Sequence, residues 1–503
     1  RLISNQVHST TLPPLRSGRH INTKRMNWKK SILVGAFILL LAACGEQALP
    51  LPFKRPLPFP TPSQHDLIVL ITSGPLTVTT DESGNMVGLA HDLASAFAQE
   101  LNVGVKFLIV APDQIDRQLA EGKAHFAATW RSPPADGQMK VTPPIAQTRD
   151  LLIQHEASLP LIELADLDGK TVHVVAGTRQ AQTMRRLATE IPDLRIVEDS
   201  GRDIINLIEA VENRQIDLTV IDSELENMAT QFAPSIQSTL QVGGEQPVVW
   251  ALGEHPNAEL EARLGAFVER VQRDGTLARL EDRYFGHVRR LKQADVRKFL
   301  AEIERTLPKL RKHFQLAEGA SGIDWRLIAA VAYHESHWDP NATSPTGVRG
   351  IMMLTEETAD RLGVTNRLDP RESIMGGARY LNLLREMQPA DVPEPDRTWL
   401  ALASYNIGPG HFNAARTLAK QLGADATAWY EMKQVLPLLA QPKYYERVKS
   451  GRARGGEAVL LVENIRAYYD ILARHEPSYQ PLSARMEGMI GMQGSSPGLK
   501  LRR

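Results

Sequence analysis

The chain has 503 residues, enough for two or three domains, and 43% of them are hydrophobic, which suffices for buried cores. Lysine and arginine together number 58, as do aspartate and glutamate, so the formal net charge of zero argues against a nucleic-acid partner held by bulk charge. Cys44 is the single cysteine, which excludes an intramolecular disulfide framework.

The first segment, residues 1–43, ends in the pattern of a secretion signal. Lys29 and Lys30 precede an apolar run of about a dozen residues, which is shorter than the roughly 20 needed to span a bilayer. The run ends in Leu-Ala-Ala followed by Cys44, which resembles a bacterial lipobox. The resemblance implies that Cys44 is lipidated, and Gly45 after it favours a lipid-anchored protein at the periplasmic face of the outer membrane. The alternative is an ordinary signal peptide in which the cysteine carries no lipid.

Residues 44–65 are rich in proline. Every second residue from Pro56 to Pro62 is a proline, and two more follow leucines at Pro50 and Pro52. This composition predicts an extended, stiff tether between the membrane and the first folded domain.

Residues 66–287 alternate between short apolar runs and segments of helical periodicity. Strands are predicted at 67–71, 105–110, 125–130, 171–175 and 218–221, and helices at 89–101, 114–120 and 204–212. Strands that alternate with helices predict a largely parallel, wound α/β domain.

From residue 288 onward the periodicity is almost wholly helical. Helices are predicted at 296–314, 325–337, 355–362, 374–387, 399–406 and 457–474. We expect a linker helix within 288–309 and a mainly α domain at 310–475. The tail at 476–503 has proline, glycine and serine without periodicity, which predicts disorder.

The predicted helix 325–337 places one carboxylate on an apolar face. Ile328, Val331 and Ala332 lie seven, four and three residues before Glu335, on the same side of a helix. Burial raises the pKa of a carboxyl group, so that it holds a proton near neutral pH, as a general acid for glycosidic cleavage must. A buried structural carboxylate paired with Arg or Lys would give the same local pattern.

Two histidines flank this glutamate, but they do not predict a metal site. His334 and His337 are three residues apart, and the sequence offers no third ligand at a matching spacing. We therefore expect neither a metal nor a cofactor.

Three motifs in order carry a family resemblance: Glu335-Ser336, Gly-Ile-Met-Met-Leu at 350–354, and Ser-Tyr-Asn-Ile-Gly at 404–408. They resemble the lytic transglycosylase domain related to goose-type lysozyme, over roughly residues 310–475. The longer run from His334 to Thr355 resembles the membrane-bound lytic murein transglycosylase F family. That family carries Met-Met-Leu at the place of residues 352–354, so Met353 fits it, and a solute-binding-protein-like domain precedes the enzyme there. The fold implied is a two-lobed α/β periplasmic-binding-protein-like domain followed by a mainly α lysozyme-like domain.

The resemblance implies that Glu335 cleaves peptidoglycan strands without water. It would protonate the glycosidic oxygen between N-acetylmuramic acid and N-acetylglucosamine, and then accept the proton of the muramic 6-hydroxyl to give a 1,6-anhydro end. Hydrolysis by retention or inversion normally needs a second carboxylate, and none is tied to Glu335 by local spacing. The substrate N-acetyl group would take that role.

The same resemblance assigns the residues around Glu335. Ser336 would orient the glutamate or contact the sugar, and backbone groups of Met352 and Met353 would line the cleft. Tyr405 and Asn406 would position the substrate acetamido group or the glutamate.

A tyrosine from the segment 443–448 should complete the site. The Tyr-x-x-x-Val spacing favours Tyr444, with Tyr445 directly after it. The alternative is that both are ordinary packing aromatics of a helix.

The first domain resembles periplasmic amino-acid-binding proteins, on residues 84–94 and on Asp-Gly-Thr-Leu at 274–277. Such domains bind ligands between two lobes, near strand ends. The residues expected to contact a ligand follow predicted strands; they are Thr129, Arg131, Thr178 and Asp222. An arginine would hold a carboxylate and an aspartate an ammonium group, unless both are plain surface charges. A muropeptide or amino acid bound here would then bias access to the enzyme cleft.

Two further functions remain open from the sequence. One is a lysozyme-type hydrolase, which would share the fold and Glu335 but release reducing ends. The other is a lipid-anchored binding or scaffold protein with an inert enzyme domain, which the presence of Glu335, Tyr405 and Asn406 disfavours.

Overall fold

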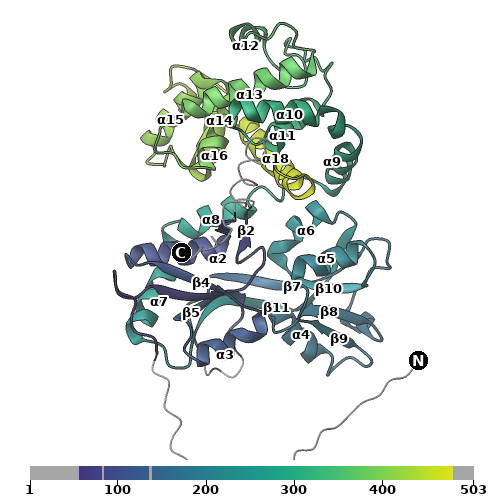
Figure 1. Cartoon of the computed structure of the whole chain (residues 1–503), viewed down its shortest axis with the longest axis vertical. Coiled ribbons are helices and arrows are strands. Elements are labelled where there is room, and N and C mark those ends of the chain that lie inside the picture. Colours follow the sequence, from purple (N-terminus) through teal and green to yellow (C-terminus); the bar gives the residue numbers. More distant parts are fainter. Residues whose placement is uncertain (1–55, 82–83, 135–136, 138, 480–503) are drawn as a thin grey trace, which may run out of the picture. The chain divides into compact units, whose positions relative to one another are not determined.

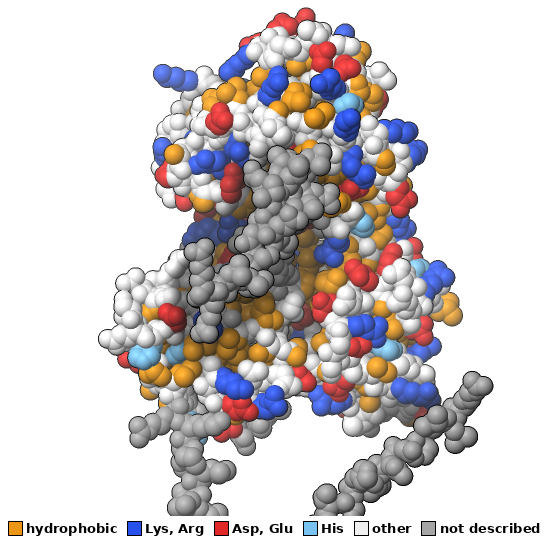
Figure 2. All heavy atoms as spheres, in the orientation of Figure 1, with side chains coloured by type: hydrophobic (Ala, Val, Ile, Leu, Met, Phe, Trp, Pro, Cys, Tyr) orange, Lys and Arg blue, Asp and Glu red, His pale blue; other side chains and the backbone are white. Residues whose placement is uncertain are grey.

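The computed structural model describes residues 56–479, except 82–83, 135–136 and 138. The signal pattern and Cys44 lie outside the described residues. Within the described part, none of the helices combines the length and apolar character needed to cross a membrane. On the face drawn in Figure 2, basic and acidic side chains are interspersed, in keeping with the zero net charge.

The first domain is built on a nine-stranded sheet in the order β4-β1-β5-β11-β7-β10-β8-β9, with β6 paired to β11 (Figure 1). Its strands are β1 Leu67–Ile71, β4 Val105–Ile109, β5 Phe126–Arg131, β6 Lys140–Val141, β7 Ala146–His155, β8 Thr171–Val175, β9 Arg195–Asp199, β10 Leu218–Asp222 and β11 Ile236–Gly253. A small separate ribbon pairs β2 Thr79–Thr80 with β3 Met86–Val87. The expectation of an α/β domain is confirmed.

The sheet is parallel at its two ends and antiparallel in its middle. β1 runs parallel to β4 and β5, and β8 runs parallel to β9 and β10. The long strands β7 and β11 are antiparallel to each other and to their outer neighbours. These two strands, absent from the sequence prediction, connect two lobes, and each lobe carries a parallel group.

Each lobe buries its own apolar clusters against its helices. The first lobe uses helices α2 Leu89–Glu100, α3 Ile115–Ala120, α7 Ala258–Arg273 and α8 Thr276–Phe285, and the second uses α4 Arg179–Leu187, α5 Ile204–Glu212 and α6 Glu226–Phe232. In the first lobe Phe126 stacks on Trp250 with ring centroids 5.3 Å apart. The separate cores leave the surface between the lobes free to hold a cleft.

The described part of the proline-rich segment lies against the first lobe. The backbone carbonyl of Pro58 is 3.0 Å from Nε2 of His125, and Phe59 packs on the first lobe's core. Part of the predicted tether 44–65 therefore packs on the first domain, because Phe59 gains apolar burial there that a solvated segment would forgo.

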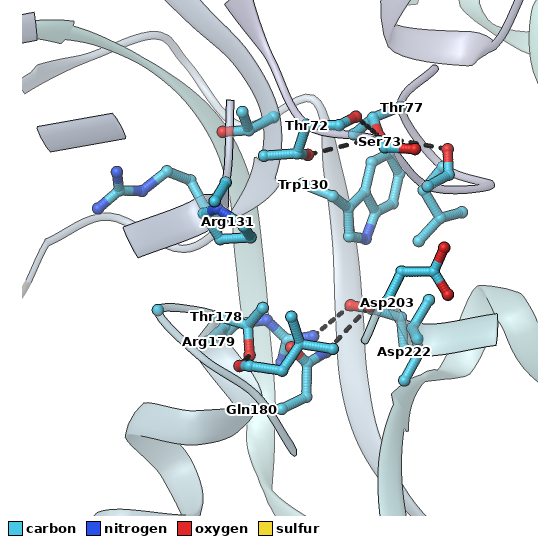
Figure 3. Close-up of a pocket in the computed structure, with 18 of the residues that line it drawn as sticks. Thr72, Ser73, Thr77, Trp130, Arg131, Thr178, Arg179, Gln180, Asp203 and Asp222 are labelled. Carbon is cyan, nitrogen blue, oxygen red and sulfur yellow. Dashed lines mark hydrogen bonds and ion pairs between the residues drawn. The ribbon is translucent and has the colours of Figure 1, made fainter. Parts of the chain in front are cut away.

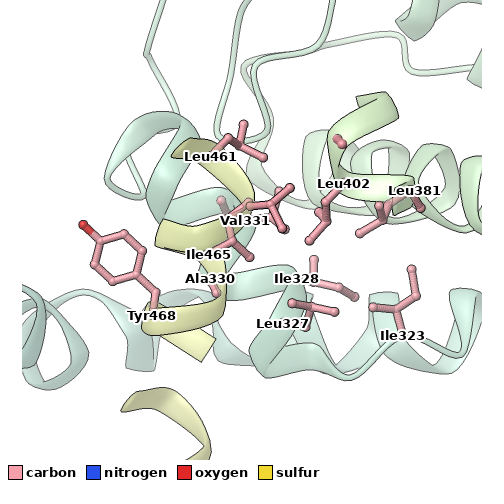
Figure 4. Close-up of a cluster of buried hydrophobic side chains, with 14 of the residues drawn as sticks. Ile323, Leu327, Ile328, Ala330, Val331, Leu381, Leu402, Leu461, Ile465 and Tyr468 are labelled. Atoms are coloured by element: carbon pink, nitrogen blue, oxygen red, sulfur yellow. The ribbon is translucent and has the colours of Figure 1, made fainter. Parts of the chain in front are cut away.

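The second domain is helical, as expected. Its helices are α9 Gln293–Arg305, α10 Leu307–Ser321, α11 Trp325–Ser336, α12 Glu356–Leu362, α13 Pro370–Glu386, α14 Asp396–Ile407, α15 Pro409–Gln421, α16 Trp429–Val435, α17 Pro442–Tyr445 and α18 Gly455–His475. Helix α11 packs against α10, α13 and α18. Figure 4 shows side chains from these segments, among them Ile328, Val331, Leu381 and Ile465, in one apolar cluster.

The predicted linker helix is part of this core. Phe299 of α9 is fully buried, with its ring centroid 4.4 Å from that of Tyr333 and 4.7 Å from that of Tyr468. The single helix expected over 296–314 is broken at Thr306, and Pro308 in the first turn of α10 lacks the backbone N–H that a continuous helix would use. The segment 288–309 therefore belongs structurally to the second domain.

The start of the tail is ordered, which corrects the expectation of disorder from residue 476. Glu476 is only 7% exposed and forms an ion pair with Arg311. The indole nitrogen of Trp325 donates to the carbonyl of Pro477 at 3.2 Å. Residues 476–479 thus pack beside the first turn of α11, because they satisfy buried polar groups there.

Candidate functional site

Helix α11 presents Glu335 near its carboxyl end. Asp324 caps the helix by accepting a hydrogen bond from the backbone N–H of Arg326 at 2.8 Å. The helix ends at His337, whose φ of 55° is left-handed. The ten buried residues of α11 fix its position in the core, so that Glu335 is held in place by packing.

Within residues 56–479, no ion pair or hydrogen bond holds the carboxyl group of Glu335 as it would a structural carboxylate. Burial alone raises its pKa to about 7, and no charged side chain among the described residues offsets this effect. A group with this pKa exists in both protonation states near neutral pH. It is therefore suited to donate a proton and then accept one.

Ser336 joins α11 to the loop 350–354. Its hydroxyl donates to the carbonyl of Ile351 at 2.9 Å and lies 3.1 Å from the carbonyl of Ala332. The side chain is buried. We infer that Ser336 positions the loop relative to Glu335, instead of contacting the sugar as one of the two expectations had it.

The loop 350–354 needs a glycine at its first position. Gly350 has a φ of 81°, and a Cβ there would lie 1.8 Å from the carbonyl oxygen of Arg367. Met353 has a φ of 47°, which is unusual for a residue with a side chain. The loop is thus tightly constrained beside Glu335.

The side chain of Met352 supports this loop from the core, and the expectation that its backbone groups line the cleft stays a prediction. Its side chain is 0% exposed and packs so closely on Gly377 that a Cβ there would lie 2.6 Å away. Its backbone N–H donates to Ser373 Oγ at 3.3 Å, and its carbonyl accepts from the hydroxyl of Tyr405 at 2.8 Å. Met353 keeps partial exposure and remains a candidate for sugar contact.

Tyr405 comes from helix α14 and reaches the same loop. Burial raises the pKa of its hydroxyl well above the usual value, and the negative charge of Glu335 adds to this effect. Tyr405 therefore lies within electrostatic range of Glu335 and remains protonated at physiological pH. Its ring also packs against Tyr380, with centroids 5.4 Å apart.

Asn406 and the two later tyrosines are less constrained. Asn406 is exposed near the end of α14. Tyr444 and Tyr445 are half-buried in the four-residue helix α17, and Tyr444 packs at the edge of the domain core. No hydrogen bond joins either tyrosine to Glu335 within residues 56–479, so their part in the site stays a prediction.

Arg367 is a supporting residue that no sequence signal indicated. Its guanidinium donates to the carbonyls of Gly347 and Leu354 at 3.0 and 3.1 Å, which ties both ends of the loop before α12. Arginine in a loop normally reads as a surface charge, and only the tertiary contacts reveal this role.

The histidines beside Glu335 are both neutral at pH 7. Burial lowers the pKa of His334 to about 4, and burial also lowers that of His337. Among the described residues, no group of three or more His, Cys, Asp or Glu could hold a metal ion.

The first domain holds a cavity of about 380 Å³ between its lobes, lined by all four residues predicted there (Figure 3). Thr129 lies in β5 and is 2% exposed. Thr178 caps α4 and donates to the carbonyl of Val175 at 2.7 Å. The four residues therefore lie together at one cavity, and their contact with a ligand stays a prediction.

The two charged residues that were predicted for the cleft, Arg131 and Asp222, are already paired. Arg131 forms an ion pair with Asp116, and Figure 3 shows its guanidinium directed away from Asp222. Asp222 accepts from Arg179 and, at 2.9 Å, from Nε2 of Gln180. Burial raises the pKa of Asp222 to about 6. Arg131 was expected to bind a carboxylate of a ligand and Asp222 an ammonium group. Both side chains already have partners within the protein.

Comparison with known proteins also divides the chain into a first domain and a second, helical domain. Residues 67–287 match the family of bacterial extracellular solute-binding proteins, family 3, and residues 312–427 match the transglycosylase SLT domain. Among solved structures, an ancestral arginine-binding protein bound to arginine is 21% identical, with a TM-score of 0.40. The match covers 44% of this chain and 98% of the arginine-binding protein.

Full-length relatives carry one name. A protein of Nitrosospira multiformis called membrane-bound lytic murein transglycosylase F is 41% identical over 89% of this chain and 93% of its own length. Proteins of the same name from Methylobacillus flagellatus and Ectopseudomonas mendocina are 39% and 37% identical, over 91% and 89% of this chain and 96% and 91% of their own.

Proposed function

The chain belongs to the membrane-bound lytic murein transglycosylase F family, and we propose that it cleaves peptidoglycan strands between N-acetylmuramic acid and N-acetylglucosamine without consuming water. The observation that carries the proposal is the isolated carboxyl of Glu335, whose pKa burial raises to about 7. Such a group is poised for both proton transfers of this reaction.

The reaction uses Glu335 twice. In its protonated form it gives its proton to the glycosidic oxygen, and the bond from that oxygen to C1 of the muramic residue breaks. The carboxylate then accepts the proton of the muramic 6-hydroxyl, whose oxygen bonds to C1 and closes the 1,6-anhydro ring. Glu335 ends protonated as it began, and no water enters. The substrate acetamido group stabilises the positive charge that develops at C1.

Among the described residues, no other carboxylate contributes to the raised pKa of Glu335, which supports this lyase chemistry over hydrolysis. Retaining and inverting glycosidases hold two carboxyl groups about 5–10 Å apart. A carboxylate that close would raise the pKa of Glu335 by repulsion, yet burial is the sole cause of its shift among the described residues.

The surrounding residues position the glutamate and the sugar. Ser336 and Tyr405 fix the carbonyls of Ile351 and Met352. Met353 and Asn406 retain exposure and contact the substrate. Tyr444 and Tyr445 complete the substrate-binding side of the cleft.

The mass of the released products tests this function. Digestion of purified sacculi by the full chain should give muropeptides with 1,6-anhydro ends, each lighter by one water than a reducing end. Reducing ends would identify a lysozyme-type hydrolase. An absence of products, with a small ligand bound in the first domain, would identify an inert enzyme domain on a binding protein.

We also propose that the protein is anchored by a lipid on Cys44 at the periplasmic face of the outer membrane. The lipobox pattern at the end of the secretion signal and the name "membrane-bound" of the relatives support this. Metabolic labelling with palmitate tests it: label in the parent and none in Cys44→Ala is expected, and equal labelling would contradict the anchor.

We propose that the first domain acts as a sensor for a muropeptide or amino acid. The cavity between two lobes with separate cores supports it, because ligands of such domains bind between lobes. A sensing role requires that a bound ligand alters the cleavage rate. A ligand that binds without changing that rate would contradict the role.

A further inference from the structure

A loop rich in basic residues begins in the short helix α17 and leads to α18 in the second domain. This basic loop, residues 443–454, holds five cationic side chains and a single carboxylate, that of Glu446, whereas the whole chain has no net charge. The five cations, all exposed, are Lys443, Arg447, Lys449, Arg452 and Arg454. The loop therefore concentrates positive charge on one part of a neutral protein.

The backbone of the basic loop is fixed to the domain core. Tyr444 and Val448 pack against the core. Ala453 is buried, and its backbone N–H donates to the carbonyl of Leu439 at 3.1 Å. A loop that is already held in place loses little entropy when it binds a ligand, so its cations are preorganised.

Three of the five cations have no partner within the part of the chain that the structure describes. Arg454 pairs with Glu457 at 3.3 Å, and the ammonium group of Lys443 lies 5.4 Å from the ring centroid of Tyr444. The side chains that form neither an ion pair nor a hydrogen bond among the described residues are those of Arg447, Lys449 and Arg452. Exposed guanidinium and ammonium groups of this kind can bind carboxylates of a ligand.

The basic loop lies toward the end of α11 that carries Glu335. Two contacts show that α18 runs antiparallel to α11. Nδ2 of Asn464 lies 3.5 Å from Nε2 of His334, near the carboxyl end of α11. Further along α18, the hydroxyl of Tyr469 donates at 2.9 Å to Asp324, which caps the start of α11. The amino end of α18 and the loop that precedes it therefore lie toward the carboxyl end of α11.

The substrate carries charges that match this loop. Each N-acetylmuramic acid residue of peptidoglycan bears a short stem peptide on its lactyl group, and stem peptides have free carboxylates. A strand held at Glu335 therefore presents such carboxylates on the muramic residue next to the bond that is cut. Exposed cations near the reacting end of α11 can bind them without taking part in the chemistry.

We propose that Arg447, Lys449 and Arg452 bind the free carboxylates of the stem peptide on the strand that Glu335 cuts, so that the enzyme favours peptide-bearing strands. The inference rests on the proposed cleavage of peptidoglycan and adds a specificity for its peptides. The position of the basic loop favours the substrate over anionic phospholipid headgroups, because a membrane at this loop would also cover the approach of a strand to Glu335.

Two kinds of strand that differ in their carboxylates test the inference with the full chain. Soluble glycan strands whose stem peptides are intact and acetylated at their amino groups are compared with the same strands after the carboxylates have been blocked as methylamides. We expect Lys449→Gln combined with Arg452→Gln to raise KM about fivefold for the anionic strands at unchanged kcat, because exposed ion pairs add modestly to binding alone. The difference between this variant and the parent should vanish on the blocked strands and shrink with added salt.

A matched control removes the same charge elsewhere on the second domain. Arg371→Gln combined with Lys420→Gln changes exposed cations of α13 and α15 and should cut both strands as the parent does. Titration calorimetry on Glu335→Gln, with and without the two loop substitutions, compares the affinities of the two strands in the absence of turnover. The loop substitutions should weaken binding of the anionic strands only.

An equal loss on anionic and blocked strands would overturn the inference, because the cations would then act on the glycan or on the fold. Parental KM and affinity for the anionic strands would overturn it as well. Weaker sedimentation of such a variant with phosphatidylglycerol vesicles would then assign the loop to a membrane surface. The mass of the products is read from the same digests: reducing ends would sink the proposed lyase reaction and leave the inference supported by the difference in KM.

Discussion

The hydroxyl of Ser336 donates a hydrogen bond to the backbone carbonyl of Ile351 at 2.9 Å. The next carbonyl in the loop, that of Met352, accepts from Tyr405 at 2.8 Å. Two helices, α11 and α14, therefore hold consecutive peptide groups of one loop. The residue that follows Glu335 in the chain is thus the one that sets the loop's position relative to it.

Loss of the Ser336 hydroxyl should lower both stability and activity. In Ser336→Ala the buried carbonyl of Ile351 loses this donor, at about 1–3 kcal/mol, and kcat should fall roughly tenfold as the loop shifts. Urea unfolding and sacculus digestion measure the two effects. Ser321→Ala is the matched control, because the buried Ser321 hydroxyl likewise donates to the carbonyl four residues before it, that of Ala317, and otherwise accepts only from the backbone N–H of Ile323 among the described residues. An equal loss of kcat in both variants would contradict the positioning role.

Removal of the Tyr405 hydroxyl should reduce kcat more than KM. Tyr405→Phe keeps the ring against Tyr380 but releases the carbonyl of Met352, so we expect a loss of about tenfold or more in kcat. Steady-state kinetics on soluble glycan strands measure this. Tyr380→Phe removes a hydroxyl from the packed neighbour and should have little effect; a comparable loss there would count against Tyr405.

Arg367 should be required for activity although it lies outside the family motifs. Arg367→Ala removes the donor to the carbonyls of Gly347 and Leu354, and we expect kcat/KM to fall about tenfold. Arg371→Ala, an exposed arginine in the first turn of α13, should retain parental kcat/KM. Parental activity in Arg367→Ala would show that the loop holds its shape without this residue.

The pH profile should report the protonated form of Glu335. Its pKa of about 7 means that the general acid is lost above neutrality, so kcat/KM should level off below about pH 7 and fall about tenfold for each pH unit well above it. Initial rates across this range measure the effect. A rate that rises with pH through neutrality would contradict the assignment of Glu335 as the acid.

The free energy of unfolding should fall when Glu335 ionises in the folded state. The folded-state pKa of about 7 lies above the unfolded value of 4.5, so the folded state binds more protons between these values and loses stability as the pH rises through them. Glu335→Gln removes this loss and should be more stable than the parent by up to about 3 kcal/mol at about pH 8. Urea unfolding should show little difference near pH 4. If Glu335→Gln were no more stable than the parent above pH 7, burial would not raise the pKa of Glu335 as stated.

Local patterns predicted much of the fold. Helix α5 has the predicted bounds, Ile204–Glu212, because its apolar spacing and its cap at Asp203 lie within the segment. Strand β11 was missed because Gly243, Gly244 and Pro247 read as loop residues, and its pairing with β7 is set by partners far away in the sequence. Long-range pairing of this kind leaves no local pattern.

The sequence singled out Glu335 but not the contacts of the residues that hold the loop beside it. Glu335 stood out because three apolar neighbours share its helical face. The partner of Ser336 and the buried state of Met352 follow from how α11, α13 and α14 pack around the loop. The same holds for Arg131, whose pairing with Asp116 only the tertiary structure reveals.

The most direct test of the central claim compares the parent with Glu335→Gln on purified sacculi in heavy-oxygen water, with mass spectrometry of the products. We expect 1,6-anhydro-muropeptides without label from the parent and no products from the variant. Labelled reducing ends from the parent, or anhydro products from Glu335→Gln at the parental rate, would contradict it.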